Sequence, residues 1–284
     1  MSLVLVVGPE LRAEARPLVA LMAGDGFAID LSTQDGTGDP ITEVERGGAH
    51  LALVSVDAPR LLPTGMSWAA VPRRMEPRDI LVPLGGTSAT LTNLAEGTRV
   101  GVAGARRWSF LRAHRPDVEP VALVNGGGPG AALASGSVDA VILGAMEARR
   151  SMPGWHATEI LDLRAWVPGA SQGAVAFVAR EEDEDAHRAA ACVEDPRARV
   201  SLAAERSVVE ALGARPNAPL GVLAMSHGRT IRLWGMVASS DGQRLVRGDL
   251  TGSVDEPEEA GRALADLLLA RGAGELLNVS GSVR

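Results

Sequence analysis

A carboxylate follows an apolar run near the N-terminus, at a position where a protein of alternating strands and helices can use it. Residues 51–54 form the run, and Ser55 and Asp57 come directly after it. Ligands of open α/β sheets bind at the carboxyl ends of the strands. A carboxylate there can act as a general acid or base, or can stabilise a positive charge. The alternative interpretation of Asp57 is a turn or a helix cap, because Asp also favours those positions.

Two adjacent arginines form the second candidate. Gly101 to Gly104 predict a strand that runs into a glycine-containing loop, and Arg106 and Arg107 then fall in the first turn of the next helix. Backbone N–H groups and guanidinium groups together can hold a carboxylate or a phosphate. The spacing matches neither the dinucleotide-binding fingerprint nor the P-loop. Two surface arginines on a helix are the alternative.

Other segments give weaker signals. Val167 to Ala174 predict a tight glycine-rich turn, and Asn125 to Gly130 predict either a small anion-binding loop or a flexible one. The single cysteine, Cys192, lies in an apolar helical stretch and is expected to be a buried small hydrophobic residue. Four of the five tryptophans are expected in the core or at interfaces, whereas Trp108 directly follows the arginine pair and remains a candidate ligand contact.

The elements that must position these residues alternate between strands and helices. Two separate series are visible, and each predicts βαβ units in a mostly parallel sheet. The first has strands at 3–7, 27–31 and 51–54 and helices at 11–22 and 41–46. After an apolar run at 80–82 the alternation starts again, with strands at 99–102, 121–124 and 140–143 and helices at 105–114 and 130–134. The sequence therefore predicts two similar α/β domains.

The last third has a different character. After a strand at 173–178, the acidic residues 181–185 predict a solvated helix start, since acidic side chains favour helix N-termini. A long helix at 198–212 comes before three apparently antiparallel strands. These strands are expected at 220–225, 231–237 and 244–250, and a final helix at 257–271 ends before Gly272 as its C-terminal cap.

Composition excludes several classes of protein. The formal net charge of −7 argues against a nucleic-acid-binding surface. One cysteine excludes an internal disulfide framework and, with five scattered histidines, argues against a structural zinc site. No apolar run approaches the roughly 20 residues of a membrane span. The start has no basic segment before its apolar run, so we expect a cytoplasmic protein with no membrane partner.

Residues 74–79 read R-M-E-P-R-D, and residues 99–107 read R-V-G-V-A-G-A-R-R. These motifs, and those that follow them in order, resemble motifs of the hydroxymethylbilane synthase (porphobilinogen deaminase) family, whose first two are R-E-D-P-R-D and R-V-G-T-S-S-L-R-R. Residues 115–117 match R-P-D, residues 136–143 resemble G-x-x-D-A-I-V-L, and Pro168 to Ala174 resemble P-A-V-G-Q-G-A with Gln172 in place. Further on, residues 199–206 resemble R-V-x-A-E-R, and Pro219 to Gly221 resemble V-P-I-G.

The resemblance implies an α/β fold with two doubly wound, periplasmic-binding-protein-like domains and a smaller C-terminal α+β domain. We expect domain 1 at residues 1–84 and 175–195, domain 2 at 85–174 and domain 3 at 196–284. The family condenses four porphobilinogen molecules, releasing ammonia, on a dipyrromethane cofactor held by a cysteine thioether. By resemblance, Asp57 is the catalytic carboxylate that stabilises cationic intermediates. Arg106, Arg107, Ser55 and Gln172 are then the residues that bind substrate or cofactor.

The chain departs from the family pattern where the cofactor is attached. The family's G-G-C-Q-V-P-I-G reads A-R-P-N-A-P-L-G over residues 214–221, so Pro216 stands where the cysteine is expected. A proline offers no nucleophile, and we therefore expect no covalent cofactor. Thr and two Ser before the arginine pair are replaced by Val102, Ala103 and Gly104. Two further family arginines, the N-terminal T-R-G-S motif and the G-K-G-L-F loop are also missing.

Three functions remain open from the sequence. The first is an active, divergent synthase of tetrapyrrole biosynthesis that polymerises porphobilinogen with a non-covalent pyrrole primer or none. The second is a catalytically inactive homologue that binds a tetrapyrrole, a precursor or a protein partner. The third is a small-anion binder of the periplasmic-binding type. Each takes a small anionic ligand or a protein, with no metal and no nucleic acid, and the family resemblance suggests a monomer.

Overall fold

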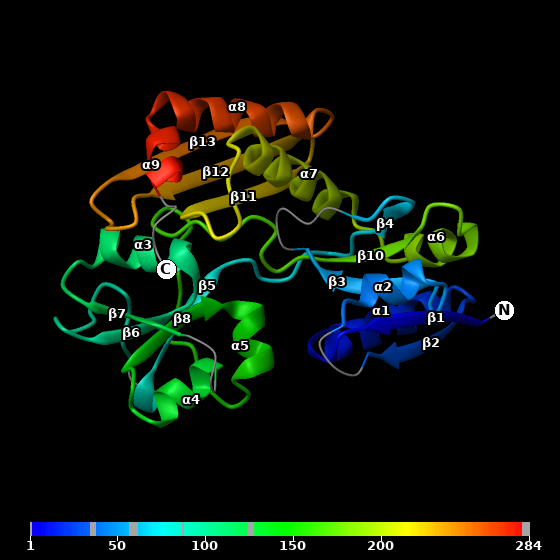
Figure 1. The fold of residues 1–284 in the computed structure, drawn as a ribbon, viewed down its shortest axis with the longest axis horizontal. Coiled ribbons are helices and arrows are strands. Elements are labelled where there is room, and N and C mark those ends of the chain that lie inside the picture. Colours follow the sequence, from blue (N-terminus) through cyan, green and yellow to red (C-terminus); the bar gives the residue numbers. More distant parts are fainter. Residues whose placement is uncertain (1, 35–37, 57–61, 87, 124–127, 280–284) are drawn as a thin grey trace. The chain divides into compact units, whose positions relative to one another are not determined.

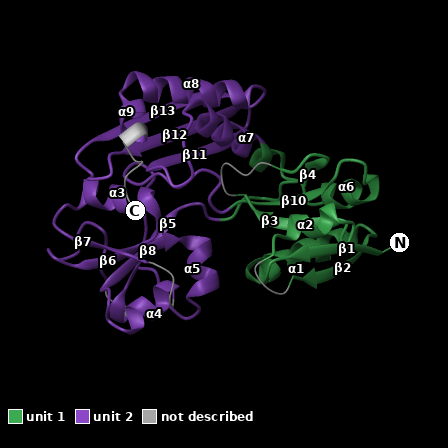
Figure 2. Cartoon of the chain, in the orientation of Figure 1, with its two compact units in different colours: residues 1–75, 174–199 green, residues 76–173, 200–284 purple. Residues whose placement is uncertain are grey.

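A computed structural model of the chain describes residues 2–34, 38–56, 62–86, 88–123 and 128–279. The chain divides into two compact units, each built from separated segments (Figure 2). Unit 1 comprises residues 1–75 and 174–199, and unit 2 comprises residues 76–173 and 200–284.

Unit 1 is a five-stranded sheet in the order β2-β1-β3-β10-β4 (Figure 1). Its strands are β1 (Ser2–Val7), β2 (Ala28–Thr33), β3 (Leu51–Ser55), β4 (Met66–Ala70) and β10 (Val175–Arg180). The helices are α1 (Arg12–Gly24), which follows the short 3-10 turn η1 (Pro9–Leu11), α2 (Pro40–Glu45) and α6 (Glu184–Ala191). β1 is parallel to β2 and β3, whereas β10 is antiparallel to β3 and β4.

Both faces of this sheet are covered, which explains why its strands are almost continuously apolar. Successive strand residues point to opposite faces. Leu5 and Leu53 therefore pack with α1 and α6 on one face, while Val6 and Val54 pack with α2 on the other.

Unit 2 contains a second five-stranded sheet in the order β7-β6-β8-β5-β9. The strands are β5 (Asp79–Pro83), β6 (Arg99–Val102), β7 (Glu119–Ala122), β8 (Ala140–Gly144) and β9 (Glu159–Ile160). The helices are α3 (Gly104–His114), α4 (Gly128–Ala134) and α5 (Ala145–Ser151), with the 3-10 turn η2 (Leu84–Gly86) after β5. α3 packs on one face through Phe110, and α4 and α5 pack on the other through Leu133 and Ala148.

A smaller antiparallel sheet completes unit 2. It is formed by β11 (Leu220–His227), β12 (Thr230–Ala238) and β13 (Leu245–Ser253), with helices α8 (Pro257–Ala270) and α9 (Ala273–Val279). Helix α7 (Pro196–Ala211) begins in unit 1, which ends at residue 199, and continues into unit 2. Figure 1 shows α8 lying along β12 and β13. Glycines permit this close packing, since a Cβ at Gly235 would lie 2.7 Å from Leu268. Met236 and Leu223 point away from α8 into the core under α3, so the two sheets of unit 2 share one core.

The fold class predicted from the sequence is confirmed, with two corrections. The large sheets are mixed instead of mostly parallel: in each, two strand pairs are parallel and two are antiparallel. Strand β5, assigned from the sequence to a first domain ending at residue 84, pairs with β8 and β9 and belongs to the second sheet. Hydrogen bonding to those strands, which the apolar pattern of residues 80–82 does not encode, decides this assignment. The three-domain division stays a prediction.

Candidate functional site

The arginine pair surrounds a buried carboxylate, Asp79, at the first residue of β5. The Asp79 side chain has no exposed surface, and the side chains of Arg106 and Arg107 are 10% and 11% exposed. Arg106 Nη1 donates to Asp79 Oδ2 across 2.6 Å, and Arg107 Nε donates to Oδ1 across 3.1 Å. The alternative interpretation of the pair as two surface arginines is therefore wrong.

Two neutral side chains complete the shell around this carboxylate. Trp166 Nε1 donates to Asp79 Oδ2 across 2.7 Å, and Gln172 Nε2 donates to Oδ1 across 3.0 Å. Gln172 Oε1 in turn accepts from Arg106 Nη2 across 2.9 Å. Each oxygen of Asp79 thus accepts two hydrogen bonds, which is how a buried charge is tolerated. We call Asp79, Arg106, Arg107, Trp166 and Gln172 the Asp79 cluster.

Local sequence explains why helix α3 presents both arginines here. The helix starts directly after β6, with Ala103 in an extended conformation and Gly104 at φ 81°. Gly104 takes this left-handed conformation without the penalty that a Cβ would impose. The sharp strand-to-helix turn predicted from the sequence is confirmed, and it puts Arg106 and Arg107 in the first helical turn.

The glycine-rich segment that carries Gln172 is fixed by buried polar contacts. Ser171 has φ 62°, and its backbone N–H donates to Glu205 Oε2 across 2.6 Å. The fully buried Glu205 also accepts from Ala224 N across 2.7 Å through its other oxygen. Gly173 has φ 79°, and a Cβ there would lie 2.9 Å from the Glu76 carbonyl oxygen. The predicted tight turn is therefore a rigid support that holds the Gln172 amide against Asp79.

Charge in the cluster is balanced with the help of a fourth ionised group. Burial alone would raise the pKa of the Asp79 carboxyl, but the positive charges of Arg106 and Arg107 dominate and hold it well below its ordinary value. Glu147 Oε2 lies 3.1 Å from Arg107 Nη1, and the Glu147 side chain is 40% exposed. Burial opposes the charge of Arg107, while Asp79 and Glu147 raise the pKa of its guanidinium. Arg107 therefore joins a fully buried carboxylate to an accessible one.

The remaining predicted site residues are placed separately. Asp57 and residues 125–127 lie outside the described residues. Ser55 ends β3 in unit 1, opposite Val175 of β10, and is partly buried. Pro216 is exposed in a turn that precedes β11 in unit 2. The structure thus brings together Arg106, Arg107 and Gln172 within unit 2, whereas Ser55 belongs to unit 1.

Two other candidates can be compared with their expectations. Cys192 is half-buried at the C-terminal end of α6, and its thiol donates to the Arg188 carbonyl oxygen across 3.7 Å. The expectation of a buried small hydrophobic residue is wrong, because Cys192 caps the helix instead of facing its packed side. Trp108 is partly buried and packs against the core under α3.

Sequence reasoning missed the two residues that organise the cluster, Asp79 and Trp166. Asp79 is the last residue of the R-M-E-P-R-D motif, which was interpreted only as a sign of resemblance. The available signal was a charged residue at the start of an otherwise apolar strand, because such a residue needs a partner if it is buried. Trp166 follows no helical or strand periodicity, and the residues around it carry no signal comparable to the charged residue at the start of β5.

The residues that the structure describes contain no group of three or more His, Cys, Asp or Glu side chains that could hold a metal ion. Among those same residues, no helix is both long and apolar enough to cross a membrane.

The fold and the Asp79 cluster define a class of protein: a doubly wound α/β protein with a small third sheet and a pair of arginines held on a buried carboxylate. The chain belongs to the porphobilinogen deaminase family. Residues 41–188 match the family model "Porphobilinogen deaminase, dipyromethane cofactor binding domain", and residues 200–270 match "Porphobilinogen deaminase, C-terminal domain".

Curated relatives agree with this assignment. The chain is 38% identical over 240 residues to a porphobilinogen deaminase of Roseiflexus castenholzii, covering 84% of this chain and 78% of the relative. It is 35% identical over 257 residues to a porphobilinogen deaminase of Syntrophus aciditrophicus, covering 88% and 83%. Among solved structures, the second substrate binding domain of a putative amino acid ABC transporter from Streptococcus pneumoniae is similar, with a TM-score of 0.48 and 15% identity. That match covers 67% of this chain and 91% of the other.

Proposed function

We propose that this protein has a hydroxymethylbilane-synthase-like role in tetrapyrrole synthesis and binds carboxylated pyrroles without a covalent dipyrromethane cofactor. The observation that carries the proposal is the position of Arg107, between the buried Asp79 and the accessible Glu147. Family membership, shown by the matches above, supplies the reaction class.

Arg107 can exchange one carboxylate partner without losing the other. Its Nε stays on Asp79, which has no access to solvent, while Nη1 contacts Glu147, whose side chain is 40% exposed. In this proposal, an acetate or propionate group of a pyrrole replaces the partly exposed Glu147 carboxylate at Nη1.

The residues at the expected attachment point do not fit a thioether-linked cofactor. Residues 215–218 form a turn closed by a hydrogen bond of 3.0 Å from Ala218 N to the Arg215 carbonyl oxygen. Pro216 and Asn217 occupy its centre, and Asn217 has φ 64°, as in a type II turn. A proline in this place preorganises the turn and supplies no sulfur.

The chain's one cysteine does not replace the missing sulfur in this proposal. Burial, and then the neighbouring Asp25 carboxylate, raise the pKa of the Cys192 thiol, which disfavours the reactive thiolate. We therefore derive no step through a bound dipyrromethane. Porphobilinogen condensation on this protein would need a free pyrrole as primer, with Asp57 stabilising the cationic intermediates.

A catalytically inactive homologue is the second candidate, and the exposed Pro216 turn is the observation that favours it. Such a protein would keep the arginine site and bind a tetrapyrrole, a precursor, another small anion or a protein partner. For either candidate we propose a cytoplasmic monomer without nucleic-acid or membrane partners, in keeping with the net charge of −7.

The test combines intact-mass measurement with turnover. The purified full chain is weighed before and after incubation with porphobilinogen, and consumption of porphobilinogen is followed for the wild type, Arg107→Gln and Arg112→Gln. Arg112 is a matched control on the same helix, where its Nε donates to the Asp241 carbonyl oxygen across 3.3 Å. Turnover without added covalent mass, lost in Arg107→Gln and kept in Arg112→Gln, supports a divergent synthase.

Two other outcomes of this experiment have a defined meaning. Binding of porphobilinogen without consumption selects the inactive homologue. A stable pyrrole adduct on the wild-type chain would overturn the proposal of a non-covalent site.

A further inference from the structure

A pocket in unit 2, separate from the Asp79 cluster, gathers five arginines. It has a volume of about 550 Å³ and lies between the segment at residues 162–167 and the strands β12 and β13. Arg78, Arg164, Arg232, Arg247 and Arg271 line it together with Asp162 and Asp249. The lining therefore carries a formal excess of three positive charges in a protein of net charge −7.

Two of these arginines have carboxylate partners within reach. Arg78 Nη2 lies 2.7 Å from Glu76 Oε2, and Arg232 Nη2 lies 3.4 Å from Asp249 Oδ2. The Arg232 guanidinium also stands over the Trp234 ring, 5.0 Å from its centroid. These pairs neutralise part of the pocket and place a flat aromatic and guanidinium surface on one wall.

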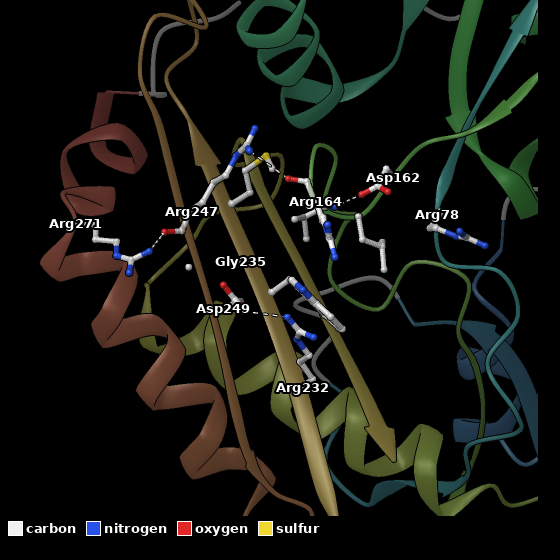
Figure 3. A pocket seen from close by; sticks show the side chains of 13 residues that line it. Arg78, Asp162, Arg164, Arg232, Gly235, Arg247, Asp249 and Arg271 are labelled. Carbon is white, nitrogen blue, oxygen red and sulfur yellow. Dashed lines mark hydrogen bonds and ion pairs between the residues drawn. The ribbon is translucent and has the colours of Figure 1, made fainter. Parts of the chain in front are cut away.

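The other three arginines show no ion pair with a carboxylate among the residues that the structure describes. Arg247 donates through Nη1 to the Arg164 carbonyl oxygen across 3.2 Å and lies 2.8 Å from His114 Nε2 through Nη2. Arg271 donates to the Arg247 carbonyl oxygen. The Arg164 backbone N–H contacts Asp162, and its guanidinium extends into the pocket (Figure 3).

The arrangement is suited to an anion that is not part of the chain. Figure 3 shows Arg164 and Arg232 extending into the same space from different walls, with Arg247 and Arg271 toward one end and Arg78 toward the other. Like charges within one partly desolvated pocket repel one another, and a bound polyanion relieves that repulsion. Guanidinium groups hold carboxylates and phosphates through paired hydrogen bonds. A pocket of about 550 Å³ has the size of a small-molecule site.

We propose that this pocket is a second binding site, for a small organic polyanion that carries two or more carboxylate or phosphate groups. The flat surface of Arg232 and Trp234 favours a ligand with a planar part. Arg164 and Arg247 supply the charge that recognises its anionic groups. The site uses no residue of the Asp79 cluster, so the inference stands independently of the proposed function.

Calorimetric titration of the full chain tests this site with two probes. Benzene-1,3,5-tricarboxylate is a planar carboxylate probe, and pyrophosphate is a compact phosphate probe. We expect saturable binding of at least one probe that weakens as sodium chloride is added, and the tighter probe then identifies the anionic group. Arg164→Gln and Arg247→Gln should each raise the dissociation constant about tenfold, equivalent to 1.4 kcal/mol.

Two control variants locate the binding. Arg229→Gln removes an exposed arginine in the turn before β12 that pairs with Asp255 outside the pocket, and it should leave binding unchanged. Arg107→Gln should also leave it unchanged, which separates this site from the Asp79 cluster. Thermal unfolding of each variant verifies that it is folded. Absence of saturable binding of both probes, or equal affinities in the wild type, Arg164→Gln and Arg247→Gln, would overturn the proposal.

Discussion

Arg106 and Asp79 form a buried ion pair, with 2.6 Å between Nη1 and Oδ2 and no more than a tenth of either side chain exposed. Removing one member of such a pair leaves the other as an uncompensated buried charge. Asp79 is the more important member, because it also accepts hydrogen bonds from Arg107, Gln172 and Trp166. The site is therefore part of what stabilises unit 2.

The first prediction concerns that stability. Asp79→Asn should lower the free energy of unfolding by about 3–5 kcal/mol, because two guanidinium groups lose their common counter-charge. Urea unfolding followed by tryptophan fluorescence measures the change. Asp139→Asn is the matched control: Asp139 pairs with Arg99 at the surface, where both side chains are about 40% exposed. A loss in the control as large as that in Asp79→Asn would contradict the buried-pair argument.

The second prediction concerns Glu147 as a displaceable partner. Glu147→Gln should increase affinity for porphobilinogen, by about tenfold if one charged hydrogen bond is freed for the ligand. Glutamine can still accept from the Gly144 N–H, as Glu147 Oε2 does across 3.3 Å, so the start of α5 should persist. Equilibrium dialysis with porphobilinogen measures the affinity. Glu210→Gln, at an exposed position of α7, is the control. A weaker affinity in Glu147→Gln would refute the replacement of Glu147 by a ligand carboxylate at Arg107.

The third prediction concerns the contact between β11 and the segment that follows Trp166. A Cβ at Gly221 would lie 2.4 Å from the Val167 carbonyl oxygen, which also accepts from Arg106 Nη1 across 3.2 Å. Gly221→Ala should therefore cost about 1–3 kcal/mol of stability through overpacking, and it should weaken ligand binding as Arg106 shifts. Gly130→Ala, in α4 with 3.6 Å to its nearest neighbour, should be neutral or slightly stabilising. Thermal unfolding compares the two, and an unchanged melting temperature in Gly221→Ala would contradict the contact.

The fourth prediction concerns pH. Burial lowers the pKa of His114, whose Nδ1 lies 2.8 Å from the Phe110 carbonyl oxygen and whose Nε2 faces Arg247. The unfolded chain therefore binds the proton more readily than the folded one. The contribution of His114 to the free energy of unfolding is fully present above the ordinary histidine pKa of about 6.5, and it is lost as the pH falls through the lowered value.

Urea unfolding at a series of pH values below neutrality measures this dependence. His114→Gln keeps a hydrogen-bonding side chain that cannot be protonated, and its stability should vary less over the same range. An identical pH dependence in the variant would assign the effect to other groups.

Much of the fold was predictable because its strands are buried on both faces. Runs such as Leu51 to Val54 and Ala140 to Leu143 are apolar throughout, and the structure places both as strands. Partner choice was not predictable in the same way. β5 and β10 join their sheets antiparallel to β8 and β3, and this orientation depends on long-range hydrogen bonds instead of local pattern.

The candidate site was predictable only where local chemistry marks it. The strand-to-helix turn with Gly104 predicted the place of Arg106 and Arg107. It could not predict that both would point inward, since this depends on Asp79, 27 residues before Arg106. The sequence predicts an anion-binding site that faces solvent. Because Asp79 is buried, the two arginines instead belong to an internal cluster, which is accessible at Glu147.

The position of β10 within its sheet has a consequence for synthesis of the chain. In unit 1, β10 lies between β3 and β4, yet it follows all five strands of the second sheet in the sequence. As the protein leaves the ribosome, β4 therefore has no strand to pair with until residues 175–180 have emerged. Domains generally begin to fold from the N-terminal end during synthesis, but here the unit that begins first is completed only after the second sheet has been made. Until then, the open edges of β3 and β4 are where we expect this nascent chain to be most open to mispairing or to chaperone binding.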